Sequence, residues 1–315
     1  MEKLIVSSSP HIHSKTTTRG IMLDVLIALT PAAIASVILF GLKALLIIAT
    51  SVVSAAVSEF LFNLACKKAQ TIGDLSAIVT GLILALCLPA KVELWQCVIG
   101  AVFAIVIVKC FFGGLGCNFA NPAATGRVFL FLAFSASVGG GSATILGKAV
   151  DLTASATPLE LIKFGNTDAL PSLMDMLLGN RSGAIGETCA LALILGGLYL
   201  IARKVIHWHT PAIFIATVFL LSLAIKQDIT LALYEVLGGG VIIAAFFMIT
   251  DYVTTPINKV GKMVFALLCG ALTVVLRFWS SYPEGVSFAI LIMNIVSPYI
   301  EKLCAYKPLG KVGKM

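Results

Sequence analysis

The sequence predicts an all-α polytopic membrane protein with about ten transmembrane helices in two inverted five-helix repeats. Of its 315 residues, 59% are hydrophobic and only 12% are charged, whereas roughly a quarter of the residues of a soluble domain are charged. Apolar stretches that approach the length needed to cross a hydrocarbon core of about 30 Å recur along the whole chain. Interrupted stretches fall at corresponding places in the two halves, which is typical of internally repeated membrane folds. These observations exclude a water-soluble domain.

Ten apolar spans are expected. In chain order they cover residues 21–40, 44–64, 75–88, 92–111, 122–136, 188–202, 211–225, 236–250, 262–278 and 287–300. The third, fifth, eighth and tenth spans are short and are interrupted by Gly, Pro or Asn. Because five is an odd number, two five-span halves inserted one after the other must be inverted relative to each other. The alternative is that Gly and Pro are simply common in membrane helices.

The distribution of Lys and Arg predicts the orientation. Fourteen of these residues fall on the side that holds both termini and seven on the other side, so both termini are expected in the cytoplasm of a cell-membrane protein. The first span is expected to remain as an anchor, since the polar start of the chain does not have the layout of a signal peptide. The expected parts are a tail at 1–20, a first repeat at 21–136, an extracytoplasmic loop at 137–187, a second repeat at 188–300 and a tail at 301–315.

Several residue types point to no particular chemistry. The eight cysteines are spread singly without a C-x-x-C pair, so they are interpreted as small apolar residues and no metal site is predicted. The net charge of +7 comes from scattered residues and does not predict nucleic acid binding. Charged residues within or near apolar spans are functional candidates because their burial is costly. They are Glu59, Arg127, Glu187, Asp251 and Glu284. The alternatives are an ion pair of Arg127 with a carboxylate, and helix capping by Glu187 and Asp251.

The long loop contains the segment DLTASATPLE, which includes Asp151, Ser155, Thr157 and Pro158. Because proline disfavours helix at the residue before it, Thr157 is expected to be extended, with an accessible hydroxyl suited to modification. The alternative is ordinary turn chemistry, for which Ser and Thr also cluster in loops.

A second polar segment, GGLGCNFANPAATGR at 113–127, has the form of a broken helix. Pro122 suits the first turn of a new helix. Asn118 and Asn121 lie just before it, and their amides could meet the polar edge of an uncharged ring. The alternative is that the two asparagines cap the helix.

The loop segment resembles the flavin-attachment motif D-x-x-[ST]-G-A-T of the membrane flavoproteins in Rnf complexes and in Na+-translocating NADH:quinone reductases. Asp151, Ala156 and Thr157 match this motif, whereas Ala154 and Ser155 depart from it. The resemblance implies that a separate flavin transferase attaches FMN to Thr157 through a phosphoester. Ser155 is the rival hydroxyl.

Four further segments resemble the same family, so the likeness covers nearly the whole chain. They are SSPHIHS at 8–14, GGLGCNFANPAATGR at 113–127, FFMITDYVTTP at 246–256 and YPEGVSFAILIMNIVSPYIE at 282–301. The family resemblance implies a fold like that of urea transporters and a non-covalent riboflavin near Asn118 and Asn121. The short N-terminal region favours the Rnf member of the family over its quinone reductase relative.

The expected function is therefore that of a membrane flavoprotein subunit that relays electrons between ferredoxin and NAD+ and couples them to Na+ or H+ movement. As part of an ion-translocating oxidoreductase, it would have membrane, flavin-bearing and iron–sulfur subunits as partners. The competing interpretations are a solute channel or transporter of urea or ammonium type, and a structural scaffold whose threonine is never modified.

Overall fold

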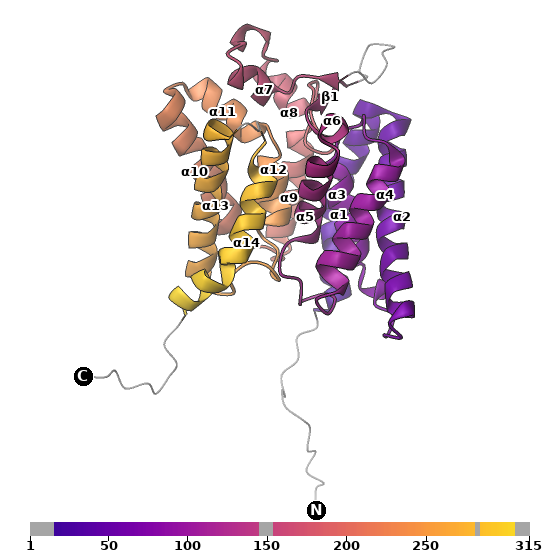
Figure 1. Cartoon of the computed structure of the whole chain (residues 1–315). Helices are drawn as coiled ribbons and strands as arrows, with labels where there is room; N and C mark the ends of the chain where they lie inside the picture. The colour runs from indigo at the N-terminus through magenta and orange to yellow at the C-terminus, as the bar shows by residue number, and fades with distance from the viewer. Residues whose placement is uncertain (1–15, 145–153, 281–283, 306–315) are drawn as a thin grey trace, which may run out of the picture.

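The computed structural model describes residues 16–144, 154–280 and 284–305, which form a bundle of helices capped at one end by a small loop region (Figure 1). The first half contains α1 (Thr18–Phe40), α2 (Leu42–Ala65), η1 (Ile72–Asp74), α3 (Ser76–Leu86), α4 (Leu94–Val102), η2 (Phe103–Cys110) and α5 (Pro122–Ala133). The loop region contains α6 (Ser135–Val138), β1 (Gly141–Ser142), β2 (Ala154–Ser155), α7 (Pro158–Lys163), η3 (Thr167–Ala169) and α8 (Leu173–Leu178). The second half contains α9 (Ala190–Ala202), α10 (His209–Lys226), α11 (Ile229–Leu237), α12 (Val241–Ile243), η4 (Ala244–Met248), α13 (Lys259–Trp279) and α14 (Val286–Leu303).

Several of these helices are long and apolar enough to cross a membrane. Within the described residues, five qualify singly, namely α1, α2, α10, α13 and α14. A sixth span results if α11 is joined to α12 and η4, which meet at a bend of 62°. Four further apolar segments are shorter and correspond to α3, α4 with η2, α5 and α9. The chain is therefore a multi-pass helical membrane protein, as predicted.

The eighth predicted span is not one continuous helix. Its start belongs to α11, which begins seven residues earlier than predicted, at Ile229 rather than at 236, and ends at Leu237. Gly239 and Gly240 then adopt positive φ angles of 63° and 71°, a backbone conformation that glycine adopts readily. The sequence GGG therefore interrupts this span, as its glycines predicted.

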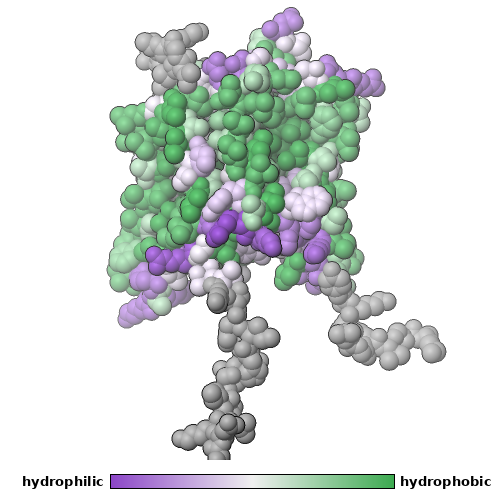
Figure 2. Space-filling model, turned by 180° about the vertical axis from the view of Figure 1, so that it is seen from behind, coloured by the Kyte–Doolittle hydropathy of each residue, from purple (hydrophilic) through white to green (hydrophobic). Residues whose placement is uncertain are grey.

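The outer surface suits contact with lipid. Large hydrophobic side chains such as Ile38 and Leu64 are 66% and 59% exposed. Figure 2 shows that hydrophobic residues cover most of one face and that hydrophilic residues gather mainly toward its two ends. In a soluble protein this surface would be a site of aggregation, whereas in a bilayer it is solvated by acyl chains.

Small residues bring the helices together. A Cβ atom on Gly196 of α9 would lie 2.0 Å from the carbonyl oxygen of Ala28 in α1. One on Gly81 of α3 would lie 2.8 Å from the Ser51 carbonyl oxygen of α2. Such contacts are typical of membrane interfaces, where close backbone approach replaces the hydrophobic driving force. In the first half α2 packs against α4, and in the second half α10 packs against α13.

The described part of the loop region contains short helices and a two-stranded sheet. Strand β1 pairs antiparallel with β2, with Gly141 opposite Ser155. Helices α7 and α8 lie at one end of the bundle, whereas α1 begins and α14 finishes at the other end (Figure 1). Thr157, which caps α7, therefore lies at the end of the bundle opposite the start of α1 and the end of α14.

Candidate functional sites

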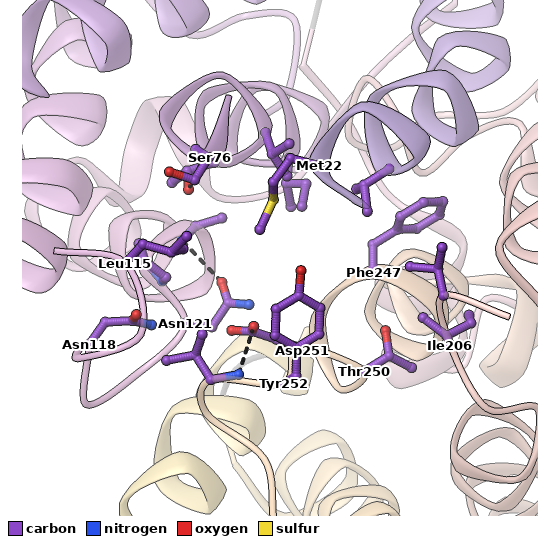
Figure 3. A pocket seen from close by; sticks show the side chains of 18 of the residues that line it. Met22, Ser76, Leu115, Asn118, Asn121, Ile206, Phe247, Thr250, Asp251 and Tyr252 are labelled. Carbon is purple, nitrogen blue, oxygen red and sulfur yellow. Dashed lines mark hydrogen bonds between the residues drawn. The ribbon is translucent and has the colours of Figure 1, made fainter. Parts of the chain in front are cut away.

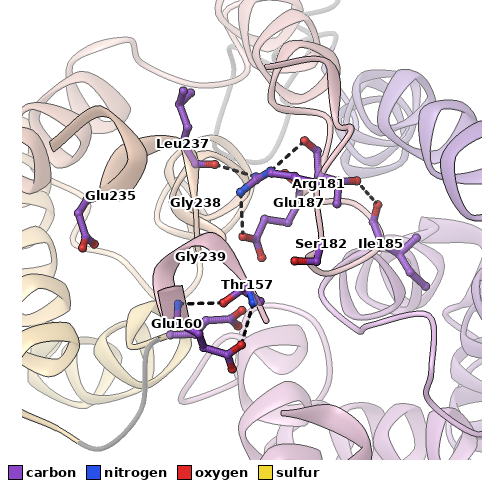
Figure 4. A network of polar contacts seen from close by, with 12 residues as sticks. Thr157, Glu160, Arg181, Ser182, Ile185, Glu187, Glu235, Leu237, Gly238 and Gly239 are labelled. Atoms are coloured by element: carbon purple, nitrogen blue, oxygen red, sulfur yellow. Dashed lines mark hydrogen bonds and ion pairs between the residues drawn. The ribbon is translucent and has the colours of Figure 1, made fainter. Parts of the chain in front are cut away.

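Thr157 connects β2 to α7 and forms the N-terminal cap of that helix. Its backbone is extended, with φ −73° and ψ 156°, as predicted from Pro158. Its Oγ1 accepts a hydrogen bond from the Glu160 amide at 3.3 Å, and its own amide donates to Glu160 Oε2 at 2.7 Å (Figure 4). This reciprocal pair is a capping box.

The exposure predicted for Thr157 is wrong, because only 4% of the residue is exposed. Besides the cap, its methyl group packs under β1: a Cβ atom added to Gly141 would lie 2.9 Å from Thr157 Cγ2 and 2.7 Å from the Gly183 amide nitrogen. Pro158 occupies the first position of α7, where its missing N–H costs nothing. Pro158 therefore starts a helix that closes over the threonine instead of holding the segment open.

Two other predicted loop residues bear on this site less directly. Asp151 lies outside the described residues. The backbone of Ser155 pairs with Gly141 in the two-stranded sheet.

Lys91 approaches from the turn before α4 and donates to the Gly139 carbonyl. Burial lowers the pKa of the Lys91 amine, and the nearby Glu160 carboxylate opposes that shift.

Beside this loop, two arginines hold the break between α11 and α12. Arg277 of α13 donates to Glu235 Oε2 at 2.9 Å and to the carbonyl oxygens of Gly238 and Gly239 at 3.0 and 3.2 Å. Arg181 donates to the carbonyl oxygens of Leu237 and Glu187, both at 2.8 Å (Figure 4). These contacts satisfy carbonyl groups that a broken helix leaves without helical partners.

The sequence did not identify either arginine as a site residue, because both were counted only as charges that predict the membrane orientation. No local pattern marked them, because Arg181 lies 56 residues before Leu237 and Arg277 lies 38 residues after Gly239. Glu187, a functional candidate by sequence, lies 3.9 Å from Arg181 Nη1 through its Oε1.

Arg127 and Glu284 form a partly buried ion pair between α5 and the segment before α14. Arg127 also donates to Ser287 Oγ at 3.0 Å. The ion-pair alternative predicted for Arg127 is therefore confirmed, and it joins the two halves of the chain.

A second candidate site is a cavity between the helices, seen from close by in Figure 3. Both halves of the chain contribute to its walls. Its apolar lining includes Met22, Val25, Val79, Ile83, Leu115, Leu200, Val205, Ile206, Phe246 and Phe247. Its polar and charged lining includes Ser76, Thr80, Lys109, Asn118, Asn121, Thr250, Asp251 and Tyr252. Apolar walls with a few convergent polar groups are typical of sites for small organic ligands.

Asn118 and Asn121 both line this cavity. Asn121 Oδ1 accepts from the amides of Ala123 and Ala124, both at 3.1 Å, so the capping alternative is confirmed for this residue. Asn118 donates to the Ala120 carbonyl at 3.0 Å. Since each amide group has both donors and an acceptor, these contacts leave the Asn121 NH2 group and the Asn118 carbonyl oxygen for a ligand.

Lys109 is a charged wall residue that sequence reasoning counted only as a topological charge. It is 2% exposed, and its Nζ donates to both Glu59 oxygens at 2.9 Å and to Ser76 Oγ at 2.6 Å. The three donors of the ammonium are thus all used. Glu59 also accepts from Thr71 at 2.6 Å, so this functional candidate lies in a buried ion pair.

Asp251 also lines the cavity, at the point where η4 gives way to a turn. Its Oδ1 accepts from the Val253 amide at 3.2 Å, and its Oδ2 accepts from Thr254 Oγ1 at 3.1 Å. Asp251 therefore closes its own turn and does not cap a helix, because the caps of η4 and α13 are Ile249 and Asn258. The same carboxylate also faces the cavity, close to Asn121 in Figure 3.

These features define a polytopic helical membrane protein with a cavity of mixed polar and apolar lining near one end and a capped threonine at the other. The chain belongs to the NQR2, RnfD, RnfE family, whose model matches residues 5–310.

Curated relatives match over nearly their full length. The chain is 43% identical to the D subunit of the Na+-translocating ferredoxin:NAD+ oxidoreductase complex of Acetobacterium woodii, over 98% of this chain and 95% of that protein. It is 40% identical to the D subunit of the proton-translocating ferredoxin:NAD+ oxidoreductase complex of Clostridium ljungdahlii, over 94% of this chain and 93% of that protein. It is 34% identical to the D subunit of the ion-translocating oxidoreductase complex of Mannheimia succiniciproducens, over 94% of this chain and 95% of that protein.

Proposed function

We propose that this chain is the D subunit of an Rnf-type ferredoxin:NAD+ oxidoreductase complex and takes part in electron transfer coupled to ion translocation. The likeness to subunits of that name, which extends over almost the whole of each chain, carries this proposal. These relatives are oxidoreductase subunits, so they favour electron transport over a urea or ammonium channel. Their names differ in the translocated ion, so the likeness leaves Na+ and H+ open.

The proposed site of covalent FMN is Thr157, through a phosphoester to its Oγ1. FMN bound there would supply one- and two-electron redox chemistry. Thr157 suits this role because its oxygen is only weakly hydrogen-bonded, but its burial must be relieved before it can react. Among the described residues its oxygen takes part in a single long hydrogen bond of 3.3 Å, which costs only about 0.5–1.5 kcal/mol to break. Because the residue is buried under β1, the cap must open before the oxygen can react.

The proposed site of a second, non-covalent riboflavin is the cavity lined by Asn118 and Asn121. Its apolar walls suit a flat ring system, and the remaining amide groups match the alternating donors and acceptors of an uncharged polar ring edge. Phe246 and Phe247 add aromatic surface to the same cavity.

The proposed membrane arrangement is ten spans in two inverted halves, with both termini in the cytoplasm and Thr157 outside. Two features support it. The pairing of α2 with α4 is matched by that of α10 with α13. Lys109 near the end of the fourth span and Arg277 near the end of the ninth each hold a carboxylate, Glu59 and Glu235.

Cysteine-accessibility labelling tests this arrangement. Cysteines placed by Asp168→Cys and Lys311→Cys are expected to react from opposite sides of the membrane. Reaction of both from one side would contradict the inverted ten-span arrangement.

The intact mass of the purified subunit tests the flavin proposal. Subunit made in cells that contain the flavin transferase is expected to be heavier by one esterified FMN than subunit made without it. Acid extraction of the same sample is expected to release riboflavin from the cavity. Equal masses in the two preparations would leave a scaffold or channel as the better account.

A further inference from the structure

The charges around the cavity lined by Asn118 and Asn121 do not balance. Lys109 is the one cationic residue among the described residues that line it. Its charge is neutralised by Glu59, which accepts two of its three hydrogen bonds. The remaining ionisable carboxylate in the lining is Asp251. The described wall thus has one negative charge without a cationic partner.

Asp251 is held so that this charge stays directed at the cavity. Its two oxygens accept from Val253 N and Thr254 Oγ1, which are neutral donors in the turn that follows. Neither donor compensates the charge, and both fix the orientation of the carboxylate. Figure 3 shows Asp251 and Asn121 facing the same space.

We propose that Asp251 makes this cavity select a flavin without a phosphate group over FMN. The proposal rests on the proposed flavin site and names the residue that determines its specificity. A phosphate monoester has a charge of about −1.5 to −2 at neutral pH. The same flavin without it is uncharged and meets only the neutral amides, the hydroxyls and the apolar walls.

The expected discrimination is large. At an effective dielectric constant of about 20 and separations of roughly 5–10 Å, repulsion per unit charge weakens binding by roughly 10-fold to a few hundred-fold. The only amine in the described lining cannot offset this, because all three of its donors are already used by Glu59 and Ser76.

A smaller hollow adjoins the cavity behind Thr250 and Tyr252, and it contains His207 and Lys262. His207 and Lys262 could attract a phosphate only if the ligand passed between the residues that line both hollows, which include Thr250 and Tyr252. The test therefore includes Lys262 as a separate arm.

The experiment compares the affinities of the full-length subunit for riboflavin and FMN. A Thr157→Ala background removes covalent flavin, and quenching of flavin fluorescence reports binding to flavin-depleted protein. In Asp251→Asn the retained Oδ1 can still accept from Val253 N, so the turn is kept while the charge is lost. We expect this variant to raise FMN affinity relative to riboflavin by at least about 10-fold.

Asp175→Asn is the matched control, because it makes the same change on helix α8 at the other end of the bundle. It is expected to leave the affinity ratio unchanged. The proposal is overturned if the ratio is the same in Asp251→Asn and in its parent. It is also overturned if the parent binds FMN as tightly as riboflavin and Lys262→Gln removes that FMN binding. Binding of neither flavin by the parent would instead refute the cavity as a flavin site, whereas covalent attachment at Thr157 is judged separately by the mass measurement.

Discussion

The Thr157 hydroxyl is closed in by its own neighbours, whereas the Asn118 and Asn121 amides face an open cavity. Thr157 is held mainly by Glu160, three residues away, and by a strand that passes over its methyl group. The cavity is lined by residues from α1 to the turn after η4, which are far apart in the chain. A site closed by local contacts can open at the cost of a few hydrogen bonds, whereas a cavity between distant segments depends on the whole fold. The two sites should therefore respond independently to mutation.

Removal of the Thr157 hydroxyl should have the largest effect. Thr157→Ala is expected to abolish in-gel flavin fluorescence of the denatured subunit, because a phosphoester needs an oxygen. Thr157→Ser keeps the oxygen and the cap, and should retain part of the signal. Loss of the cap costs about 0.5–2 kcal/mol, so the subunit should still assemble and keep riboflavin. FMN found on Ser155 by peptide mapping, or fluorescence that persists in Thr157→Ala, would identify a different acceptor.

Substitutions in the cavity should affect riboflavin and leave the modification of Thr157 intact. The double variant Asn118→Leu with Asn121→Leu is expected to lose most acid-extractable riboflavin, since the free amide groups disappear, while Thr157 is still modified. Asn121→Ser is the matched control because serine can still cap α5, so it separates loss of the cap from loss of the ligand contacts. Unchanged riboflavin in the double variant would show that the asparagines serve only the helix.

A smaller effect is expected from the Glu160 side chain. Glu160→Ala removes one half of the capping box, worth about 0.5–1.4 kcal/mol. If flavin attachment requires the open cap, the initial rate of attachment to purified, unmodified subunit by the transferase should rise about 2- to 10-fold. Glu160→Gln is the control, since glutamine can complete the same box. A rate that falls equally in both variants would instead mean that the transferase recognises the carboxylate.

Much of the helical architecture was predictable because membrane spans depend on long apolar runs, which sequence shows directly. In the described part of the chain, five of the ten predicted spans match helices long enough to cross a membrane, and four match shorter apolar helices. The capping role of Asn121 and the ion pair of Arg127 were among the alternatives that the residue types allowed. These features follow from chemistry within a few residues or from the cost of a charge in lipid.

Other features depended on contacts that no local pattern contains. The burial of Thr157 needs β1 and Gly183, which lie about 15 residues before it and 26 after it. Lys109 looked like an interfacial charge at the end of a span, and only tertiary packing brings Glu59 and Ser76 to it. The bend at Gly239 was visible as GGG, but its direction is set by Arg181 and Arg277 from other segments.

The arginine contacts at that bend also limit how the protein can move. Guanidinium groups stay charged across the pH range in which proteins are folded, so their bonds to the carbonyl oxygens of Leu237, Gly238 and Gly239 do not switch with protonation. The angle between α11 and α12 should therefore be constant through a catalytic cycle. Any rearrangement that accompanies ion movement is then expected to be a displacement of this bent unit as a rigid body, with its hinges in segments that lack such charged anchors.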